Sequence, residues 1–281
     1  MSILFSFLSG VLGVVFIVVA AVVVLSCTIA WYEYANREPQ LVEDRFSGGR
    51  LAFALGLIAS ETLCLAASVL VHPLGWTAPR EKMVRAEEQT PVIFLHGLFH
   101  NRACWLWLKY RLRRRGVNAL YTLNLPPWKD VETLTERVAK KVDELRHATG
   151  VDKVSLVGHS MGGIIARNYL QLRGGADKVA MCVLLGTPNA GSKLAPFALS
   201  PLGKLVLPGS PFLHRLAEAP LPPETRVTSI YSRHDNIILP FESARLEGSR
   251  NEELAGMGHT ALLYRSRVFE TLLNALRKEE P

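Results

Sequence analysis

The sequence predicts an α/β fold, in which helices cover both faces of a mostly parallel β-sheet, preceded by one or two transmembrane helices. This prediction rests on two features of the chain. From about residue 79 onward, short apolar runs alternate with helical stretches, as in strands that are joined by crossover helices. Before that point, two long apolar stretches follow one another with almost no charge.

The first apolar stretch covers residues 3–30 and contains no charged side chain. A helix needs about 20 apolar residues to cross the core of a bilayer, and this stretch is longer. A cleaved signal peptide would start with basic residues and have a shorter apolar core, so we expect a retained transmembrane helix. Trp31, Tyr32 and Tyr34 follow directly, where the aromatic side chains of a membrane interface would lie.

The second apolar stretch covers residues 51–71 and contains one carboxylate, Glu61. A carboxylate at the centre of a transmembrane helix costs about 2.5–3.5 kcal/mol, which the other apolar residues can offset. We expect a second span here, with Glu61 protonated or facing the first helix. The alternative is a helix that lies on the membrane or packs on the domain that follows. Basic residues flank both stretches in nearly equal number, so the positive-inside rule assigns no orientation.

The chain therefore divides into an expected membrane anchor, residues 1–78, and a second domain, residues 79–281. In the second domain we expect strands at 92–95, 117–125, 154–157, 179–185 and 227–231, and helices at 103–115, 131–148, 163–172 and 260–277. Residues 191–225 interrupt this alternation with many Pro, Leu and Gly residues. Long irregular segments in compact domains are often functional, so we expect a lid or acyl-binding cap there. A long surface loop with one or two helices is the alternative.

The strongest local signal is the segment Gly158-His159-Ser160-Met161-Gly162. It lies between a predicted strand and a predicted helix, which is the context of a nucleophile elbow. Glycines at both ends permit the tight turn that lifts a serine above the edge of the sheet. The segment therefore predicts that Ser160 is a catalytic nucleophile.

A serine hydroxyl is a weak nucleophile unless a neighbouring base removes its proton. In this arrangement an Asp or Glu follows the serine along the chain, and a His follows that carboxylate. His259 lies in a glycine-containing loop before the last predicted helix, where the base is expected, and Asp235 follows the last predicted strand, where it would orient His259. Glu242 is a less favoured substitute, and Asp177 lies at the wrong end of the sheet. His234 is expected to be structural or exposed.

Two backbone N–H groups are expected to form an oxyanion hole. One belongs to Met161, directly after the nucleophile, and the other to Leu98, in the loop after the first strand. Such donors stabilise the negative charge that develops on the carbonyl oxygen in the transition state. His96, in the same loop as Leu98, is expected to shape that loop and not to act as a base.

The overall composition limits the partners. The formal net charge is +7 at neutral pH, and the N-terminal segment is apolar. This combination favours an anionic membrane surface, and no nucleic-acid-binding motif is present. The four cysteines show neither the spacing of metal ligands nor that of a disulfide framework. We therefore expect a membrane and a lipophilic substrate as partners, without nucleic acid, metal or organic cofactor.

Four segments together resemble bacterial lipases of the α/β-hydrolase superfamily, over the chain from about Pro91 to the end. They are His-Gly at 96–97, Gly-His-Ser-Met-Gly-Gly at 158–163, Gly-Thr-Pro-Asn-Ala-Gly-Ser at 186–192 and Gly-His-Thr-Ala-Leu-Leu-Tyr at 258–264. The resemblance implies the α/β-hydrolase fold and hydrolysis of carboxylic esters without a metal or cofactor. It also implies that Ser160, Asp235, His259, Leu98 and Met161 have the roles given above.

The expected function is therefore a membrane-anchored lipase or carboxylesterase that works through an acyl-enzyme on Ser160. Many lipases of this kind are secreted, so the apolar N-terminal segment suggests a membrane lipid or another lipophilic ester as substrate, and a location in a bacterial inner membrane. A thioesterase, an acyltransferase or an amidase would use the same side chains, because the fold does not choose among these reactions. A non-catalytic membrane scaffold is the remaining hypothesis, and the complete set of catalytic side chains argues against it.

Overall fold

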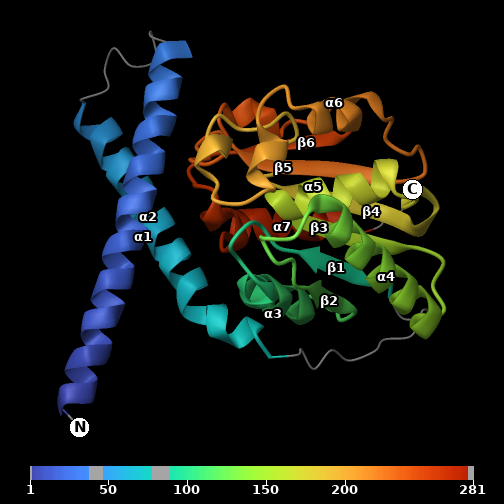
Figure 1. The fold of residues 1–281 in the computed structure, drawn as a ribbon, viewed down its shortest axis with the longest axis horizontal. Helices are drawn as coiled ribbons and strands as arrows, with labels where there is room; N and C mark the ends of the chain where they lie inside the picture. The colour runs from blue at the N-terminus through green and yellow to red at the C-terminus, as the bar shows by residue number, and fades with distance from the viewer. Residues whose placement is uncertain (1, 38–46, 78–88, 278–281) are drawn as a thin grey trace.

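The computed structural model describes residues 2–37, 47–77 and 89–277, which form a pair of long helices beside an α/β domain (Figure 1). The boundary that we expected between residues 78 and 79 lies outside the described residues. At the centre of the domain is a sheet of six strands: β1 (Val92–Leu95), β2 (Leu120–Leu123), β3 (Val154–His159), β4 (Val179–Leu185), β5 (Arg226–Ser232) and β6 (Arg250–Leu254). Their order is β2-β1-β3-β4-β5-β6, and every neighbouring pair is parallel. All loops that follow the strands therefore meet at one edge of the sheet.

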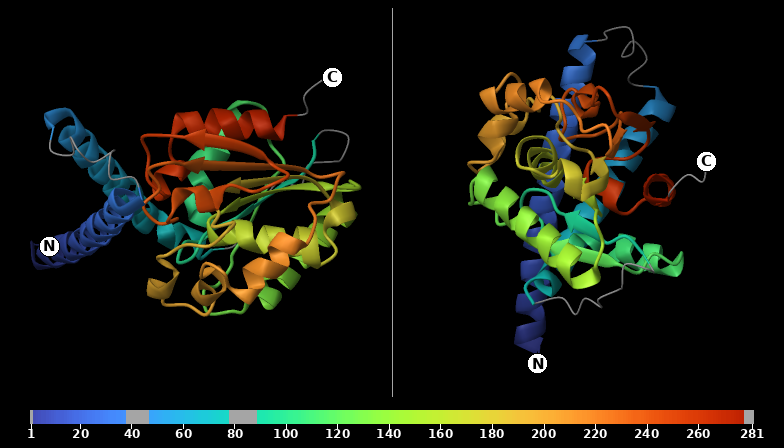
Figure 2. Two further views of the ribbon diagram at one scale, coloured as in Figure 1. Left: turned by 90° about the horizontal axis from the view of Figure 1, so that it is seen from above. Right: turned by 90° about the vertical axis from the view of Figure 1, so that its right-hand side faces the viewer.

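Helices cover both faces of the sheet, so the domain has three layers (Figure 2). One face carries α3 (Leu106–Arg114) and α7 (Ser266–Leu276), and the other carries α4 (Val131–Thr149), α5 (Met161–Arg167) and α6 (Pro211–Glu218). A separate apolar core lies on each side of the sheet. Because both faces are covered, the central strands β1 and β3 are buried at every residue, as is usual for a parallel sheet.

Each expected strand overlaps one of β1 to β5, although β2 is shorter than the expected 117–125. Two features of the C-terminal part also differ from the prediction. The strand β6 was not predicted, because its sequence Arg-Asn-Glu-Glu-Leu is mostly charged; it forms an exposed edge and pairs only with β5. The helix expected over residues 260–277 is interrupted. A short 3-10 helix, η9 (Thr260–Leu263), comes first, and α7 begins only at Ser266.

The first apolar stretch forms α1 (Ser2–Arg37), a helix of 36 residues. At 1.5 Å per residue this is about 54 Å, longer than the roughly 30 Å core of a bilayer. Its N-terminal half projects past the α/β domain (Figure 1), and its apolar side chains there, such as Phe5 and Ile17, are exposed. Among the described side chains of α1, the buried ones are Val19, Val23 and Ser26, near the middle of the helix.

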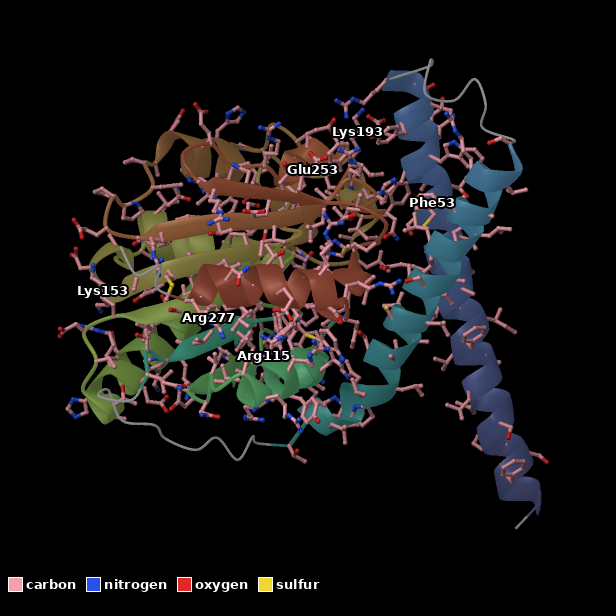
Figure 3. The ribbon with its side chains drawn as sticks, turned by 180° about the vertical axis from the view of Figure 1, so that it is seen from behind. Phe53, Arg115, Lys153, Lys193, Glu253 and Arg277 are labelled. Carbon is pink, nitrogen blue, oxygen red and sulfur yellow. The ribbon has the colours of Figure 1, made fainter. Side chains whose placement is uncertain are left out.

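The second apolar stretch forms α2 (Gly48–Val71), and one of its faces packs on the α/β domain. Glu61 and Ser68 are buried on that face. Phe53, which is labelled in Figure 3, meets the His234 ring edge-on, with ring centroids 5.0 Å apart. Exposed apolar side chains line the opposite face, namely Leu55, Leu63 and Leu70. Both α1 and α2 are long and apolar enough to cross a membrane. For α2, the structure also shows the packing on the following domain that we considered as the alternative.

The irregular segment 191–225 packs firmly on the face of the sheet that carries α5. It contains η6 (Ala195–Phe197), η7 (Gly203–Val206) and α6. Phe212 and Leu216 of α6 are buried in the core on that side. The buried guanidinium of Arg167, at the end of α5, donates to the carbonyl of Leu216 at 3.1 Å and to that of Asn189 at 3.2 Å. The segment is thus a packed layer against α5.

Candidate active site

The predicted nucleophile elbow has the strained geometry that its sequence indicates. Ser160 joins β3 to α5 with φ 53° and ψ −123°, a region that side chains other than glycine rarely adopt. A Cβ atom at Gly162 would collide with the carbonyl oxygen of Leu95, and one at Gly158 would lie 2.5 Å from the Cα of Gly163. The absence of side chains at the two glycines therefore lets the elbow pack closely against the end of β1 and against the start of α5. Ser160 is left partly accessible at the carboxyl edge of the sheet.

Asp235 and His259 form a hydrogen-bonded pair at the same edge. The Nδ1 atom of His259 lies 2.8 Å from Oδ2 of Asp235, and both side chains are almost completely buried. The other carboxylate oxygen of Asp235 accepts the backbone N–H groups of Ile237 at 2.8 Å and Ile238 at 2.9 Å. Because both oxygens of Asp235 are occupied, the carboxylate is fixed in one orientation toward the imidazole.

The electrostatic surroundings of His259 favour a proton on its ring. Burial on its own disfavours the imidazolium, but the charge and the hydrogen bond of Asp235 outweigh burial, and Glu61 adds to them. The net effect raises the pKa of His259 above its usual value. An imidazole in this environment accepts a proton readily, as a general base must.

His159, directly before Ser160 in the chain, packs against His259. The rings of His159 and His259 have centroids 4.7 Å apart, and Nε2 of His159 lies 3.3 Å from the carbonyl oxygen of His259. No hydrogen bond joins the Ser160 hydroxyl to His259 among the described residues. Catalytic hydrogen bonds of this kind often tighten only when substrate is bound.

The two predicted oxyanion donors flank the serine. Leu98 lies in the loop after β1, and Met161 is the first residue of α5. Within residues 89–277, the backbone N–H groups of both residues donate to no other group of the protein. A Cβ atom at Gly97, directly before Leu98, would lie 2.9 Å from Cβ of Ser160, so the loop after β1 approaches Ser160 closely.

His96 holds that loop in place, as its sequence position suggests. Its Nε2 atom accepts the backbone N–H of Leu125 at 2.8 Å, so the proton is on Nδ1, which donates to the carbonyl oxygen of Gly97 at 2.9 Å. Burial lowers the pKa of His96 to about 3, and the ring is therefore neutral. Both ring nitrogens are occupied by the backbone, which leaves neither of them available as a catalytic base.

The rival carboxylates lie elsewhere. Glu242 forms an ion pair with Arg37 of α1 at 2.8 Å, and Asp177 lies in the short helix before β4, at the opposite edge of the sheet. The ring of His234 accepts the backbone N–H of Gly256 at 3.0 Å, which is a structural contact. In the described part of the chain, no group of three or more His, Cys, Asp or Glu side chains is placed to hold a metal ion.

Sequence reasoning missed the groups that hold the loop of His259 from the side of the two apolar helices. Glu61 of α2 accepts the backbone N–H groups of Thr260 and Ala261. Asn236 accepts the N–H of His259 at 3.0 Å and donates to the hydroxyl of Ser26 of α1 at 2.7 Å. The available signal was the single carboxylate in an apolar stretch, because a buried carboxylate without partners is very costly. The identity of its partners was not visible in the sequence.

A cavity of about 600 Å³ lies between the two apolar helices and the loop after β5. Apolar side chains of α1 and α2 line it, and so do Asp235 and Asn236. Ser160 and His259 are not among its lining residues. The cavity therefore reaches Asp235 from the side of the two apolar helices and does not include Ser160.

A protein-family model described as the alpha/beta hydrolase family matches residues 92–262. The chain belongs to this family. The match begins with β1 and extends past His259, so it includes the elbow and the Asp235–His259 pair. The parallel sheet with helices on both faces is the α/β-hydrolase fold that the sequence predicted.

Curated relatives of this hydrolase include two bacterial enzymes. A triacylglycerol lipase of Pseudarthrobacter phenanthrenivorans is 31% identical over 121 residues, which cover 40% of this chain and 37% of that protein. A triacylglycerol lipase of Burkholderia plantarii is also 31% identical over 121 residues, with 40% of this chain and 33% of that protein covered. The hydrolase therefore spans only a third to two-fifths of the length of these relatives.

Solved structures with the same fold include two lipases. The mature form of Bacillus licheniformis lipase BlEst2 has a TM-score of 0.60 and 20% identity, and the match covers 72% of this hydrolase and 96% of that chain. Aspergillus fumigatus lipase B has a TM-score of 0.63 and 20% identity, with 73% and 56% covered. At this level of identity, the likeness establishes the fold of the domain.

Proposed function

We propose that this hydrolase is a membrane-anchored carboxylic ester hydrolase, a lipase or carboxylesterase, that works through an acyl-enzyme on Ser160. The observation that supports this most is the strained elbow of Ser160 beside the buried Asp235–His259 pair. The triacylglycerol lipases among its relatives favour an ester as the substrate class.

In the proposed reaction, the Ser160 hydroxyl attacks the ester carbonyl while Nε2 of His259 takes its proton. Asp235 holds the imidazole by Nδ1 and stabilises the imidazolium. The N–H groups of Leu98 and Met161 donate to the carbonyl oxygen as it becomes negative. The imidazolium then protonates the leaving alcohol, and the acyl group stays on Ser160. Water, activated by the same imidazole, releases the acid and restores the enzyme.

Exposed apolar side chains at the carboxyl edge of the sheet support a lipophilic substrate. Phe197 is 71% exposed and Leu199 is 91% exposed, and both belong to the segment 191–225. Trp128, 73% exposed, lies in the loop after β2, and the hydroxyl of Ser200 donates to the carbonyl oxygen of Pro127 in that loop. Grouped apolar exposure of this kind marks surfaces that contact membranes or apolar ligands. In the proposal, the segment 191–225 is the acyl-binding cap.

The proposed anchor is α1, with the exposed apolar face of α2 against the lipid, in a bacterial inner membrane. A cleaved signal sequence would also be apolar and N-terminal. A retained helix is supported by the contacts that α1 makes with the α/β domain. Ser26 binds Asn236, Arg37 pairs with Glu242, and Glu33 pairs with Lys193, which lies beside the end of α1 in Figure 3.

The test is hydrolysis of p-nitrophenyl esters, from short to long acyl chains, by the full chain in detergent, with Ser160→Ala as the matched variant. We expect activity that rises with chain length and disappears in Ser160→Ala. Activity limited to short chains would replace the lipase by an esterase with a small pocket. If no ester is turned over by the folded protein in a Ser160-dependent manner, the proposal is wrong, and thioester and alcohol-acceptor assays would be the next step.

A further inference from the structure

The most unusual side chain of the anchor is Glu61, a carboxylate in the middle of an apolar helix. Its side chain is 1% exposed. One carboxylate oxygen accepts the backbone N–H of Thr260 at 2.6 Å, and the other accepts that of Ala261 at 2.9 Å. These are the first two residues of η9, directly after His259. The first N–H groups of a helix have no partner within the helix, so the carboxylate satisfies two groups that burial would otherwise leave unpaired.

The contact is close on both sides of the imidazole-bearing residue. A Cβ atom at Gly258 would lie 2.5 Å from a carboxylate oxygen of Glu61 and 2.8 Å from the amide oxygen of Asn236. Asn236 accepts the N–H of His259 itself. Three successive backbone N–H groups, at residues 259, 260 and 261, are therefore held by side chains from outside the loop. The backbone that carries the imidazole has little freedom to move while Glu61 is in place.

Docking of the helix alone does not account for a carboxylate at this position. Two further bonds already connect α2 to the same part of the domain: the hydroxyls of Ser68 and Tyr264 lie 2.7 Å apart, and Arg265 donates to the hydroxyl of Ser60. A buried carboxylate carries a large desolvation cost, and well-packed apolar groups are often at least as stabilising. The desolvation cost of the buried Glu61 carboxylate is better explained if the carboxylate has a role in the active site.

We propose that Glu61 is a positioning residue of the active site: its carboxylate fixes the backbone next to His259, so that α2 completes the catalytic geometry besides anchoring the domain. This inference rests on the proposed function of His259 as the general base. Glu61 touches neither the serine nor the substrate in this proposal. It acts through the orientation of the imidazole between Asp235 and Ser160.

The positioning of a general base affects the turnover rate more than it affects the binding of substrate. Small displacements of a catalytic group can lower a rate about a hundredfold, because the reacting atoms must be aligned in the transition state. The acyl chain binds elsewhere in the proposed site, at the exposed apolar side chains of segment 191–225. Loss of the Glu61 contact should therefore lower kcat and leave KM nearly unchanged.

The experiment compares Glu61→Gln, Glu61→Leu and the control Ser68→Ala in the full chain in detergent. Glutamine retains the shape of glutamate and one acceptor oxygen, whereas leucine retains neither acceptor. We expect kcat for a p-nitrophenyl ester to fall about tenfold in Glu61→Gln and about a hundredfold in Glu61→Leu, with KM within about twofold of wild type. Ser68→Ala removes another hydrogen bond between α2 and the domain, and its kcat should stay within about twofold of wild type, as for a contact remote from the reacting atoms.

A second measurement reports on the loop without relying on activity. Amide hydrogen exchange of a peptide that contains residues 258–263 should become faster in both Glu61 variants and stay unchanged in Ser68→Ala. Exchange in β3 and β4 should be the same in all variants, which shows that the domain is folded. Glu61→Gln keeps the test valid if Glu61→Leu does not fold.

Wild-type kcat in both folded Glu61 variants would overturn the proposal. Equal losses in the Glu61 variants and in Ser68→Ala would also overturn it, since docking in general would then be the cause. The proposed ester hydrolysis fails in a different way, by a lack of Ser160-dependent turnover in wild type. In that case, unchanged exchange at residues 258–263 in Glu61→Gln would still contradict the contact itself, and faster exchange would support it.

Discussion

The two halves of the candidate site are held in different ways. Ser160 is fixed by its own neighbours in the chain and by the strand beside them, all within the α/β domain. The loop of His259 is fixed by Asn236 and Glu61, and Asn236 is in turn bound by Ser26 of α1. The position of the proposed nucleophile is thus a local property of the elbow, whereas the position of the proposed base also depends on α1 and α2. A substitution in α1 or α2 should therefore disturb the position of His259 and leave the elbow unchanged.

The largest effect should come from the elbow side, with Ser160→Ala. We expect a loss of kcat of about 10⁶-fold, because no other side chain can form the acyl-enzyme. The thermal unfolding temperature should change little, because alanine fits the same turn. Labelling of the wild-type serine by a fluorophosphonate, followed by mass spectrometry, identifies the residue. Labelling at another serine would show that the elbow is not the nucleophile.

The second largest effect should come from Asp235→Asn. We expect kcat to fall about 10⁴-fold, because an asparagine leaves the imidazole in the wrong tautomer. Glu242→Gln is the matched control, since Glu242 pairs with Arg37 at the surface and should leave kcat within about twofold. A larger loss in the Glu242 variant than in the Asp235 variant would reverse the assignment of the acid.

The pH dependence of kcat/KM tests the role of His259 separately from that of the elbow. His259 must be neutral to act, so kcat/KM falls as the pH drops through its pKa. Besides Asp235 and Glu61, the groups that face His259 are the rings of His159 and His100, whose pKa values burial lowers, that of His100 to about 4. They are uncharged near neutral pH and do not oppose a proton on His259. Because the carboxylates raise the pKa of His259, we expect the acid limb above the usual value of about 6.5.

The same pH profile should reveal how much Glu61 of α2 contributes to the pKa of His259. Glu61→Gln removes a group that favours the imidazolium, so the acid limb of kcat/KM should move to lower pH. Glu242→Gln changes a carboxylate that pairs with Arg37, away from His259, so it is the control and should leave the limb in place. A limb that stays fixed in Glu61→Gln would mean that Glu61 acts on the backbone alone.

The smallest effect should come from Ser26→Ala. The variant removes the hydrogen bond from Asn236 to α1, which is worth about 1 kcal/mol, or about fivefold in kcat at most. Thr28→Val is the matched control, because the Thr28 hydroxyl bonds only to the Val24 carbonyl of its own helix. Equal activity of both variants would show that α1 does not contribute to the base.

Sequence patterns predicted the elbow well because its evidence is contiguous. Five consecutive residues around Ser160, between a strand and a helix, specify both the backbone turn and the chemistry. Asp235 and His259 were predicted from their order in the chain, and the structure places them 2.8 Å apart, although their catalytic roles stay a prediction. The sheet was predicted from apolar runs, which is why β6, with its charged edge sequence, was not.

The contacts of α1 and α2 with the candidate active site could not be predicted from the sequence. Glu61 bonds to backbone N–H groups, and these are the same in every residue except proline, so no pattern at 260 and 261 signals them. Asn236 and Ser26 are common polar residues in unremarkable surroundings. What the sequence did provide was the anomaly of one carboxylate in an apolar stretch, without the partner that explains it.

The distance along the chain between Glu61 and its partners has a consequence for biosynthesis. Its partner Thr260 lies 199 residues later, so almost the whole protein is made before this contact can form. Contacts of such high sequence separation form late and slowly, because a long loop must close first. The elbow can therefore fold during synthesis while the loop of His259 is not yet fixed by Glu61. Under the proposed function, the enzyme would acquire its full activity only after the C-terminal segment has packed against α2, a helix that is made near the start of synthesis.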